Sequence, residues 1–246
     1  MTNNTLKSKQ PCPFDCGSSD AYSEKLRIDG SAFGKCFSCL RWTNLDGNYE
    51  PVSNTARYLE LSPQRLLACR IYDIPATFLR QYGVGYVDQY RISDKAVRYN
   101  QLVLQSVLDG EYRGCQLKNL RSTDKSYKYM TLAKDDLVYY TKLKTEHCET
   151  LVITEDWCSA IKVKYATGLE ALALTGSSLA RTSYLMGFIL KICPNEIIIW
   201  LDADYAGRKG AYATYKTLSN LFPTRVIQQD EPKLLPAEKI KEILIE

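Results

Sequence analysis

The last hundred residues alternate between apolar, strand-like runs and helix-like segments, and this alternation restricts the fold more than any other feature of the chain. The strand-like runs read "TLVIT", "EALALT", "EIIIWLDAD" and "TRVIQQ". Helical patterns follow them over 156–167, from "GSS" to about Cys193, over 207–221, and in "PAEKIKEIL". Short connections between alternating strands and helices are typical of a parallel sheet with right-handed crossovers. We therefore predict an α/β domain over 147–246, with a mainly parallel sheet flanked by helices.

Acidic residues follow two of these strands directly. Glu155 comes after the first strand, and Asp202 and Asp204 end the third, in "WLDADYAGRKG". The active groups of parallel sheets lie at the carboxyl ends of the strands. In an extended chain, the side chains of residues i and i+2 point to the same side. Clustered carboxylates repel one another unless a cation neutralises them, and oxygen ligands suit Mg²⁺ or Mn²⁺. The sequence thus predicts a divalent-metal site at Glu155, Asp202 and Asp204; the alternative is that these acids are helix N-caps.

Four cysteines near the N-terminus have the spacing of a metal site. A C-x3-C pair and a C-x2-C pair are separated by 19 residues, and they consist of Cys12, Cys16, Cys36 and Cys39. Two such pairs complete the closed tetrahedral geometry of structural zinc, and Gly17 and Gly34 beside them suit tight turns. We predict one structural Zn²⁺ in a zinc-binding ribbon over 11–43, against the alternative of a chance set of free thiols. The other five cysteines are scattered and are expected to be ordinary reduced thiols.

The surroundings of the second cysteine pair suggest a nucleic-acid contact. Lys35, Phe37, Arg41 and Trp42 place basic and aromatic side chains together, which suits phosphate contact and base stacking. The compatible alternative is that the aromatic residues cover the small ribbon core. Residues 1–10 are polar and are expected to form a disordered tail, and the polar segment 44–56 is expected to be a linker.

Residues 57–146 are predicted to form a mixed α+β subdomain. The pattern is helical from Arg57 to Tyr82 and strand-like from Ala96, with a hairpin signal at Asp109-Gly110. The segment 111–144 holds eight basic and four acidic residues, and this excess equals the net charge of +4 of the whole chain. Such a localised basic block indicates a polyanionic partner, unless it is only a solvated, charged strand pair.

The chain has no apolar stretch of transmembrane length, and its polar start lacks the apolar core of a signal peptide. We therefore expect a soluble, cytoplasmic protein with no membrane partner.

The acids and their context resemble a known family. A glutamate after an apolar strand, followed 47 residues later by "DADYAGRKGA", resembles the Toprim fold. The order of cysteine ribbon, basic "RSTDKSYKYM" and Toprim segment is similar to that of bacterial-type DNA primases, above all the primase half of bacteriophage primase-helicases. The resemblance implies a DNA-directed RNA polymerase, a nucleotidyltransferase that makes short RNA primers on single-stranded DNA by divalent-metal-assisted transfer.

The resemblance also implies roles for individual residues. Lys125 and Lys128 match the nucleotide-binding lysines of the family, Arg121 matches a neighbouring basic residue, and Lys118 matches more weakly. Lys128 would join the three acids in catalysis. The segment "QQDEPK" resembles the late acidic motif, which makes Asp230 a further magnesium ligand. The implied cofactors are structural Zn²⁺ and catalytic Mg²⁺ or Mn²⁺; the implied partners are single-stranded DNA template, nucleoside triphosphates, and a separate replicative helicase and DNA polymerase.

One motif departs from the family. The glutamate motif is usually E-G-x-x-D, whereas this chain has Glu155, Asp156, Trp157, Cys158 and Ser159. Two other functions therefore stay open. A Toprim nuclease would use the same acids without needing the basic segment, and a catalytically decayed module would only bind single-stranded DNA. Metal-dependent synthesis from nucleoside triphosphates separates both from a primase.

Overall fold

The computed structural model describes residues 5–13, 17–26, 32–36, 38, 42–44, 71–93, 96–119, 129–133, 137–176 and 183–245. The chain divides into two compact units, Met1–Ser53 and Asn54–Glu246, so the two subdomains predicted after the linker belong to one unit. Among the described residues, no helix is both long enough and apolar enough to cross a membrane.

The first unit contains a four-stranded antiparallel sheet of order β1-β2-β3-β4. Its strands are β1 Thr5–Gln10, β2 Tyr22–Leu26, β3 Ala32–Cys36 and β4 Trp42–Asn44. The prediction of a disordered tail over 1–10 was wrong for β1, because its backbone pairs with β2 and so satisfies the hydrogen bonds of that strand. Likewise Asn44, expected to begin the linker, pairs with Phe33.

Gly34 corrects a second expectation. It lies inside β3, paired with Glu24 and Thr43, and is not part of a turn. A Cβ atom at this position would lie 1.8 Å from the hydroxyl oxygen of Tyr22, so the missing side chain makes room for the tyrosine. Gly17 does have the positive φ of 75° that a tight turn requires.

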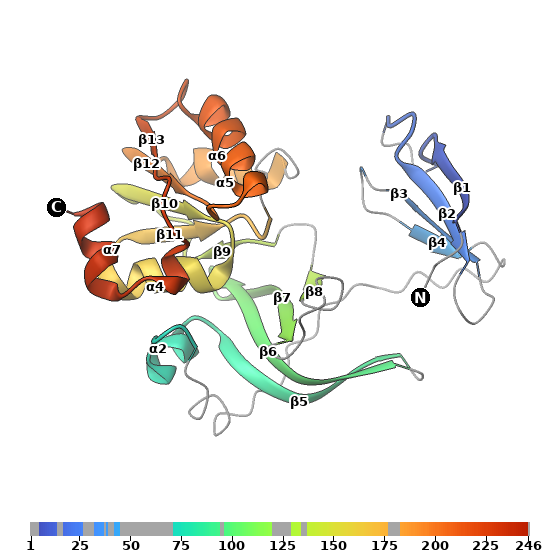
Figure 1. Cartoon of the computed structure of the whole chain (residues 1–246), viewed down its shortest axis with the longest axis horizontal. Helices are drawn as coiled ribbons and strands as arrows, with labels where there is room; N and C mark the ends of the chain where they lie inside the picture. The colour runs from blue at the N-terminus through green and yellow to red at the C-terminus, as the bar shows by residue number, and fades with distance from the viewer. Residues whose placement is uncertain are drawn as a thin grey trace. The chain divides into compact units, whose positions relative to one another are not determined.

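The second unit contains a five-stranded sheet of order β13-β12-β10-β11-β9 (Figure 1). Its strands are β9 Tyr139–Tyr140, β10 Thr150–Thr154, β11 Glu170–Ala173, β12 Glu196–Trp200 and β13 Thr224–Val226. The helices are α4 Trp157–Thr167, α5 Ser183–Ile192, α6 Tyr205–Leu218, the 3-10 turn η2 Pro232–Leu234, and α7 Ala237–Leu244. The predicted alternation is confirmed, with the short edge strand β9 as an antiparallel addition.

This sheet is buried on both faces, and successive strand residues belong to different cores. Val152 and Ile198 pack with α4 and α7, whereas Leu151 and Ile153 pack with α5 and α6. Both cores consist of fully buried apolar side chains, which explains why the strands read as continuous apolar runs. The result is a mixed α/β arrangement of three layers.

A second sheet of order β5-β6-β7-β8 lies in the same unit. Its strands are β5 Val84–Ser93, β6 Ala96–Leu108, β7 Glu111–Asn119 and β8 Tyr129–Ala133. The predicted hairpin is confirmed, because Asp109 and Gly110 have φ of 55° and 79° between β6 and β7. The hydroxyl of Tyr139 donates to the carbonyl of Leu104 at 2.7 Å, which ties the two sheets together.

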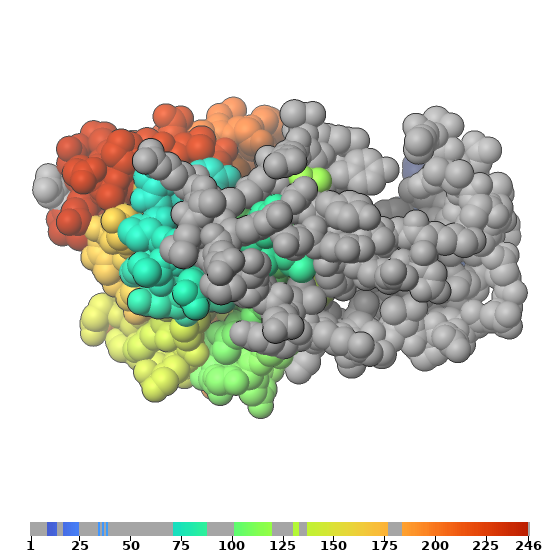
Figure 2. Space-filling view, turned by 90° about the horizontal axis from the view of Figure 1, so that it is seen from below, coloured from blue at the N-terminus to red at the C-terminus, as the bar shows by residue number. Residues whose placement is uncertain are grey.

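Helix α2, Ala76–Gln81, lies within the helical pattern predicted from Arg57 to Tyr82, but residues 71–75 are not helical, since Ile71 and Ile74 form an isolated β-bridge. Its Phe78 ring lies 5.2 Å from that of Tyr165 on α4, centroid to centroid, and Tyr82 lies 6.0 Å from Trp157. Figure 2 shows α2 on the surface beside these segments. The contact fixes α4, and with it the loop that leads from β10 into α4.

Candidate active site

Two neighbouring parallel strands bring the predicted acids to one edge of the sheet. Strands β10 and β12 pair in register, with Thr154 opposite Trp200. Glu155 is the first residue after β10, and Asp202 is the second after β12. Strand β10 lies between β11 and β12, so the connection reverses direction across the sheet here. Such a switch point is where open α/β sheets hold their ligands.

The chain after β12 turns tightly into α6. Asp204 is the N-cap of this helix, and its carboxylate accepts a hydrogen bond from the backbone N–H of Gly207 at 2.7 Å. A Cβ atom on Gly207 would lie 2.0 Å from the carbonyl oxygen of Asp202. The glycine therefore lets the first turn of α6 approach the Asp202 backbone closely. Asp204 is therefore a helix N-cap, which was the alternative interpretation of the sequence. Its charge nevertheless lies at the same strand end as that of Asp202.

Glu155 and Asp202 are partly buried and electrostatically coupled. Burial and then the charge of Asp204 raise the pKa of the Glu155 carboxyl, although a hydrogen bond from the Asp202 backbone lowers it. Burial raises the pKa of Asp202 to about 7, against the opposing charge of Lys233 and with the help of Glu155. One oxygen of each carboxylate, Oε2 of Glu155 and Oδ1 of Asp202, is buried and has no hydrogen-bond partner among the residues that the structure describes. Such orphaned carboxylate oxygens fit a divalent cation with oxygen ligands.

Lys233 lies among these acids, although no role for it was predicted from the sequence. Its ammonium contacts the carboxylates of Asp156 and Glu231 directly and lies 3.7 Å from Oδ2 of Asp202. Burial by itself lowers the pKa of Lys233. The charge of Asp156 and the hydrogen bonds to Asp156 and Glu231 together outweigh this effect and raise the pKa well above its usual range. The lysine is therefore charged and held among the acids.

Asp156, Asp202 and Glu231 form a group that could itself hold a metal ion, since their ligand oxygens all lie within 4.8 Å of one another. Asp156 also caps α4, where it accepts from the backbone N–H of Ser159 at 3.0 Å. The predicted ligand Asp230 is outside this group: its side chain is exposed, and its carbonyl accepts from Nε1 of Trp200 at 3.0 Å. The motif "QQDEPK" also contains Glu231 and Lys233, which contact the acids, whereas the residue predicted from it as a ligand was Asp230.

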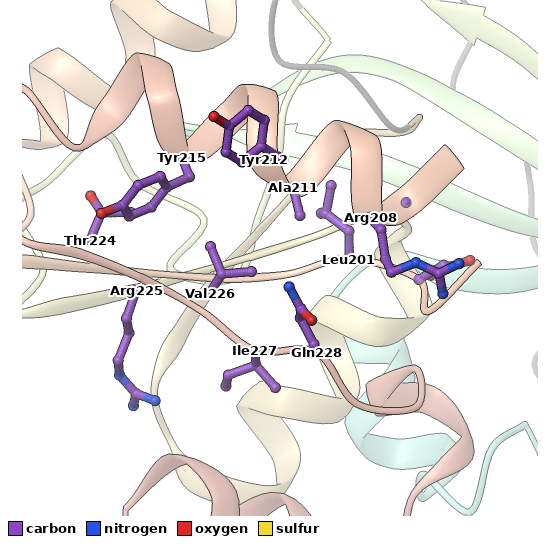
Figure 3. A pocket seen from close by; sticks show the side chains of 12 residues that line it. Leu201, Arg208, Ala211, Tyr212, Tyr215, Thr224, Arg225, Val226, Ile227 and Gln228 are labelled. Carbon is purple, nitrogen blue, oxygen red and sulfur yellow. The ribbon is translucent and has the colours of Figure 1, made fainter. Parts of the chain in front are cut away.

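A groove of about 400 Å³ opens beside Asp202, between α6 and β13 (Figure 3). Apolar side chains such as Ala211 and Val226 line it together with aromatic and polar ones. The aromatic, basic and amide side chains are Tyr212, Tyr215, Arg208, Arg225 and Gln228. Tyr212 is 65% exposed, so much of its ring is open to solvent. Rings, guanidinium groups and an amide suit the bases and phosphates of a nucleotide or strand.

The predicted nucleotide-binding residues Arg121, Lys125 and Lys128 lie outside the described residues. Lys118, the weaker match, lies on β7 and is only 3% exposed. Its ammonium donates to the hydroxyl of Tyr72 at 2.6 Å and lies 4.8 Å from the centre of that ring. In this conformation Lys118 helps to position the segment before α2, and its predicted contact with nucleotide stays a prediction.

The predicted zinc and template residues are described only in part. Cys16, Cys39, Phe37 and Arg41 lie outside the described residues, as do the side chains of Lys35 and Trp42.

The described half of the cysteine set gathers around one tyrosine. Tyr22 pairs with Cys36 across β2 and β3. Burial raises the pKa of Tyr22, and the charges of Glu24 and then Cys12 raise it to a smaller extent. One cysteine from each predicted pair therefore lies near the same side chain, and the zinc site itself stays a prediction. The backbone N–H of Cys12 donates to the carbonyl of Ser18 at 2.9 Å.

No protein-family model matches the sequence, and no curated protein matches it significantly. Solved structures match the fold. The primase fragment of the bacteriophage T7 primase-helicase is similar with a TM-score of 0.51 and 19% identity, covering 94% of this chain and 93% of that one.

Two bacterial structures are also similar. The DnaG primase catalytic domain bound to single-stranded DNA has a TM-score of 0.55 and 13% identity over 73% of this chain and 68% of its own. The RNA polymerase domain of Mycobacterium tuberculosis DnaG has a TM-score of 0.54 and 15% identity over 74% and 73%. At these identities the likeness is one of fold, and the chain has the fold of bacterial and bacteriophage primase catalytic domains.

Proposed function

We propose that this protein is a DNA primase, which makes short RNA primers on single-stranded DNA from nucleoside triphosphates. The observation that carries the proposal is the pair of buried carboxylate oxygens on Glu155 and Asp202, which have no hydrogen-bond partner among the described residues. They lie at adjacent strand ends in a fold shared with primase catalytic domains. This arrangement suits a site that handles phosphates through a divalent cation.

In the proposed reaction, the 3′-hydroxyl of one nucleotide attacks the α-phosphorus of the next, and pyrophosphate leaves. Glu155, Asp202 and Asp204 would hold Mg²⁺ or Mn²⁺, which would stabilise the charge that develops on the phosphate oxygens. Arg121, Lys125 and Lys128 would bind the triphosphate through charge-assisted hydrogen bonds. The carboxylates thus position the reacting phosphate, while the basic residues neutralise the remaining phosphates.

The N-terminal unit would serve the template. We assign it as a zinc ribbon in which Cys12, Cys16, Cys36 and Cys39 hold one Zn²⁺. Its basic and aromatic residues would contact single-stranded DNA by phosphate pairing and base stacking. The second unit would be the Toprim-containing polymerase part, and a replicative helicase and DNA polymerase would be separate proteins, as in a phage-type replication system.

One observation favours a second candidate, a catalytically decayed module that only binds single-stranded DNA. Lys233 already supplies a positive charge to Asp156 and Glu231, as a metal ion would in their group. This reduces the need for a metal at that part of the site. The groove beside Asp202 would remain useful for binding a strand in either case.

The test is incubation of the purified protein with labelled single-stranded DNA, nucleoside triphosphates and Mg²⁺. A primase leaves the DNA intact and forms new RNA that depends on both metal and template. Shortened DNA without new RNA would identify a nuclease, and a retarded but unchanged DNA would identify a binding module. Omission of the triphosphates is the matched control, because it abolishes synthesis and leaves nuclease activity in place.

A further inference from the structure

The group of carboxylates that could hold a metal by itself is already filled by a side chain of the same protein. The Lys233 ammonium contacts Asp156 and Glu231 and lies 3.7 Å from Asp202, which are the three members of that group. An ordinary surface lysine has one carboxylate partner in a flexible geometry. Here three carboxylates converge on one ammonium, and only 10% of the lysine side chain is exposed.

The backbone around Lys233 fixes it in this place. Pro232 is buried, and the backbone N–H of Leu234 donates to the carbonyl of Glu231 at 2.9 Å, which closes the η2 turn. The indole of Trp200, at the end of β12, donates to the carbonyl of Asp230 at 3.0 Å. The loop that carries the lysine is therefore anchored to the strand that leads to Asp202. The lysine is thus positioned by the fold as well as by its own ion pairs.

The two carboxylate oxygens of Asp202 have different surroundings. Its Oδ2 faces Lys233, whereas its Oδ1 is buried and has no hydrogen-bond partner within the described part of the chain, and the same holds for Oε2 of Glu155. Glu155 lies near charges of both signs, since Asp204 raises the pKa of its carboxyl and Lys233 lowers it. The site therefore has one part that a cation already occupies and another part whose oxygens have none.

We propose that Lys233 is a tethered cation that stands where a second divalent ion would otherwise bind, so that this site takes a single divalent ion on the Glu155, Asp202 and Asp204 side. A divalent ion among Asp156, Asp202 and Glu231 would have to displace the ammonium or lie directly next to it. Two positive charges in such close contact repel each other strongly. Lys233 is thus a positioning residue, which orients Asp202 and limits the number of ions. The inference rests on the proposed function only in assigning the bound ion to nucleotidyl transfer.

The experiment counts Mn²⁺ ions bound to the full chain by isothermal titration calorimetry and by electron paramagnetic resonance of free Mn²⁺. Wild type and Lys233→Arg, which keeps the charge, are expected to bind about one Mn²⁺. Lys233→Met is expected to bind about two, because the three carboxylates are released for a second ion. Lys239→Met is the matched control: this exposed lysine pairs only with Glu242, at 2.6 Å, among the contacts described, and should leave the count at one.

Thermal unfolding supplies the second measurement. Without divalent ions, Lys233→Met should unfold at a lower temperature than wild type, because its acids lose their cation, and Mn²⁺ should restore the loss. Adding Asp156→Asn to this variant removes one ligand and should return the Mn²⁺ count to one. The inference is overturned if Lys233→Met binds as many ions as wild type, or if Mn²⁺ does not restore its stability. Neither readout requires primer synthesis, so the failure of this inference and that of the proposed function are separate results.

Discussion

Replacement of Asp202 by asparagine should stabilise the metal-free protein at alkaline pH. The substitution keeps the shape of the side chain and removes a charge that Glu155, Glu231 and Asp156 repel. The folded-state pKa of about 7, against an ordinary value of 3.8, means that the fold resists ionisation of this carboxyl. Its contribution to stability is therefore present below about pH 4 and is lost as the pH rises through 7.

The size of the effect follows from the same shift. Roughly three pKa units correspond to about 4 kcal/mol in a dry site. The Asp202 side chain is 20% exposed, and solvent screens part of the repulsion, so we expect roughly 1–2 kcal/mol between pH 5 and pH 8. The unfolding free energy of wild type should therefore fall by this amount, relative to that of Asp202→Asn, as the pH rises from 5 to 8. Mg²⁺ should restore wild type by mass action and restore the variant less.

Urea unfolding followed by tryptophan fluorescence measures this difference. Two of the three tryptophans, Trp157 and Trp200, are buried in the unit that carries the acids. The matched control is Glu242→Gln, which removes an exposed acid that pairs with Lys239. If the difference in unfolding free energy between wild type and Asp202→Asn is the same at pH 5 and pH 8, the repulsion on which the metal site depends is absent.

Two further substitutions test the parts of the function that lie away from the strand ends. Cys36→Ser should lose the single bound zinc and with it template-directed initiation, as metal analysis and primer synthesis would show; an active variant without zinc would rule out the ribbon. Lys128→Ala should raise the nucleoside triphosphate concentration needed for half-maximal rate, with little change in unfolding temperature. An unchanged dependence on nucleotide would mean that the basic segment is only a solvated face.

The parallel sheet could be predicted because its strands are buried on both faces and therefore form continuous apolar runs. Helix boundaries were also readable where a local signal exists: Gly168, with φ of 77°, ends α4 as expected. Helix α6 begins at Tyr205, two residues before the predicted start, because Asp204 and not a later residue caps it. Strand β5 was not predicted, and tail residues 5–10 became a strand only through pairing with β2, a tertiary effect.

The site was predictable to the extent that topology alone determines it. Glu155, Asp202 and Asp204 follow strands that a parallel sheet places side by side, so their convergence could be argued from the alternation. The role of Lys233 could not, because it depends on how the loop after β13 folds back onto α4 and the end of β12. Asp156 was visible only as a departure from the family motif, and its ion pair with Lys233 gives that departure a physical reason.

Dinucleotide formation by wild type, Asp202→Asn and Glu155→Gln, on templates that cover all trinucleotides, tests the central claim most directly. The account predicts Mg²⁺- or Mn²⁺-dependent product from wild type on some of these templates. It predicts turnover lower by several orders of magnitude in both variants, although both remain folded. If both variants synthesise product at the wild-type rate, the acids only cap helices and the proposed mechanism is wrong.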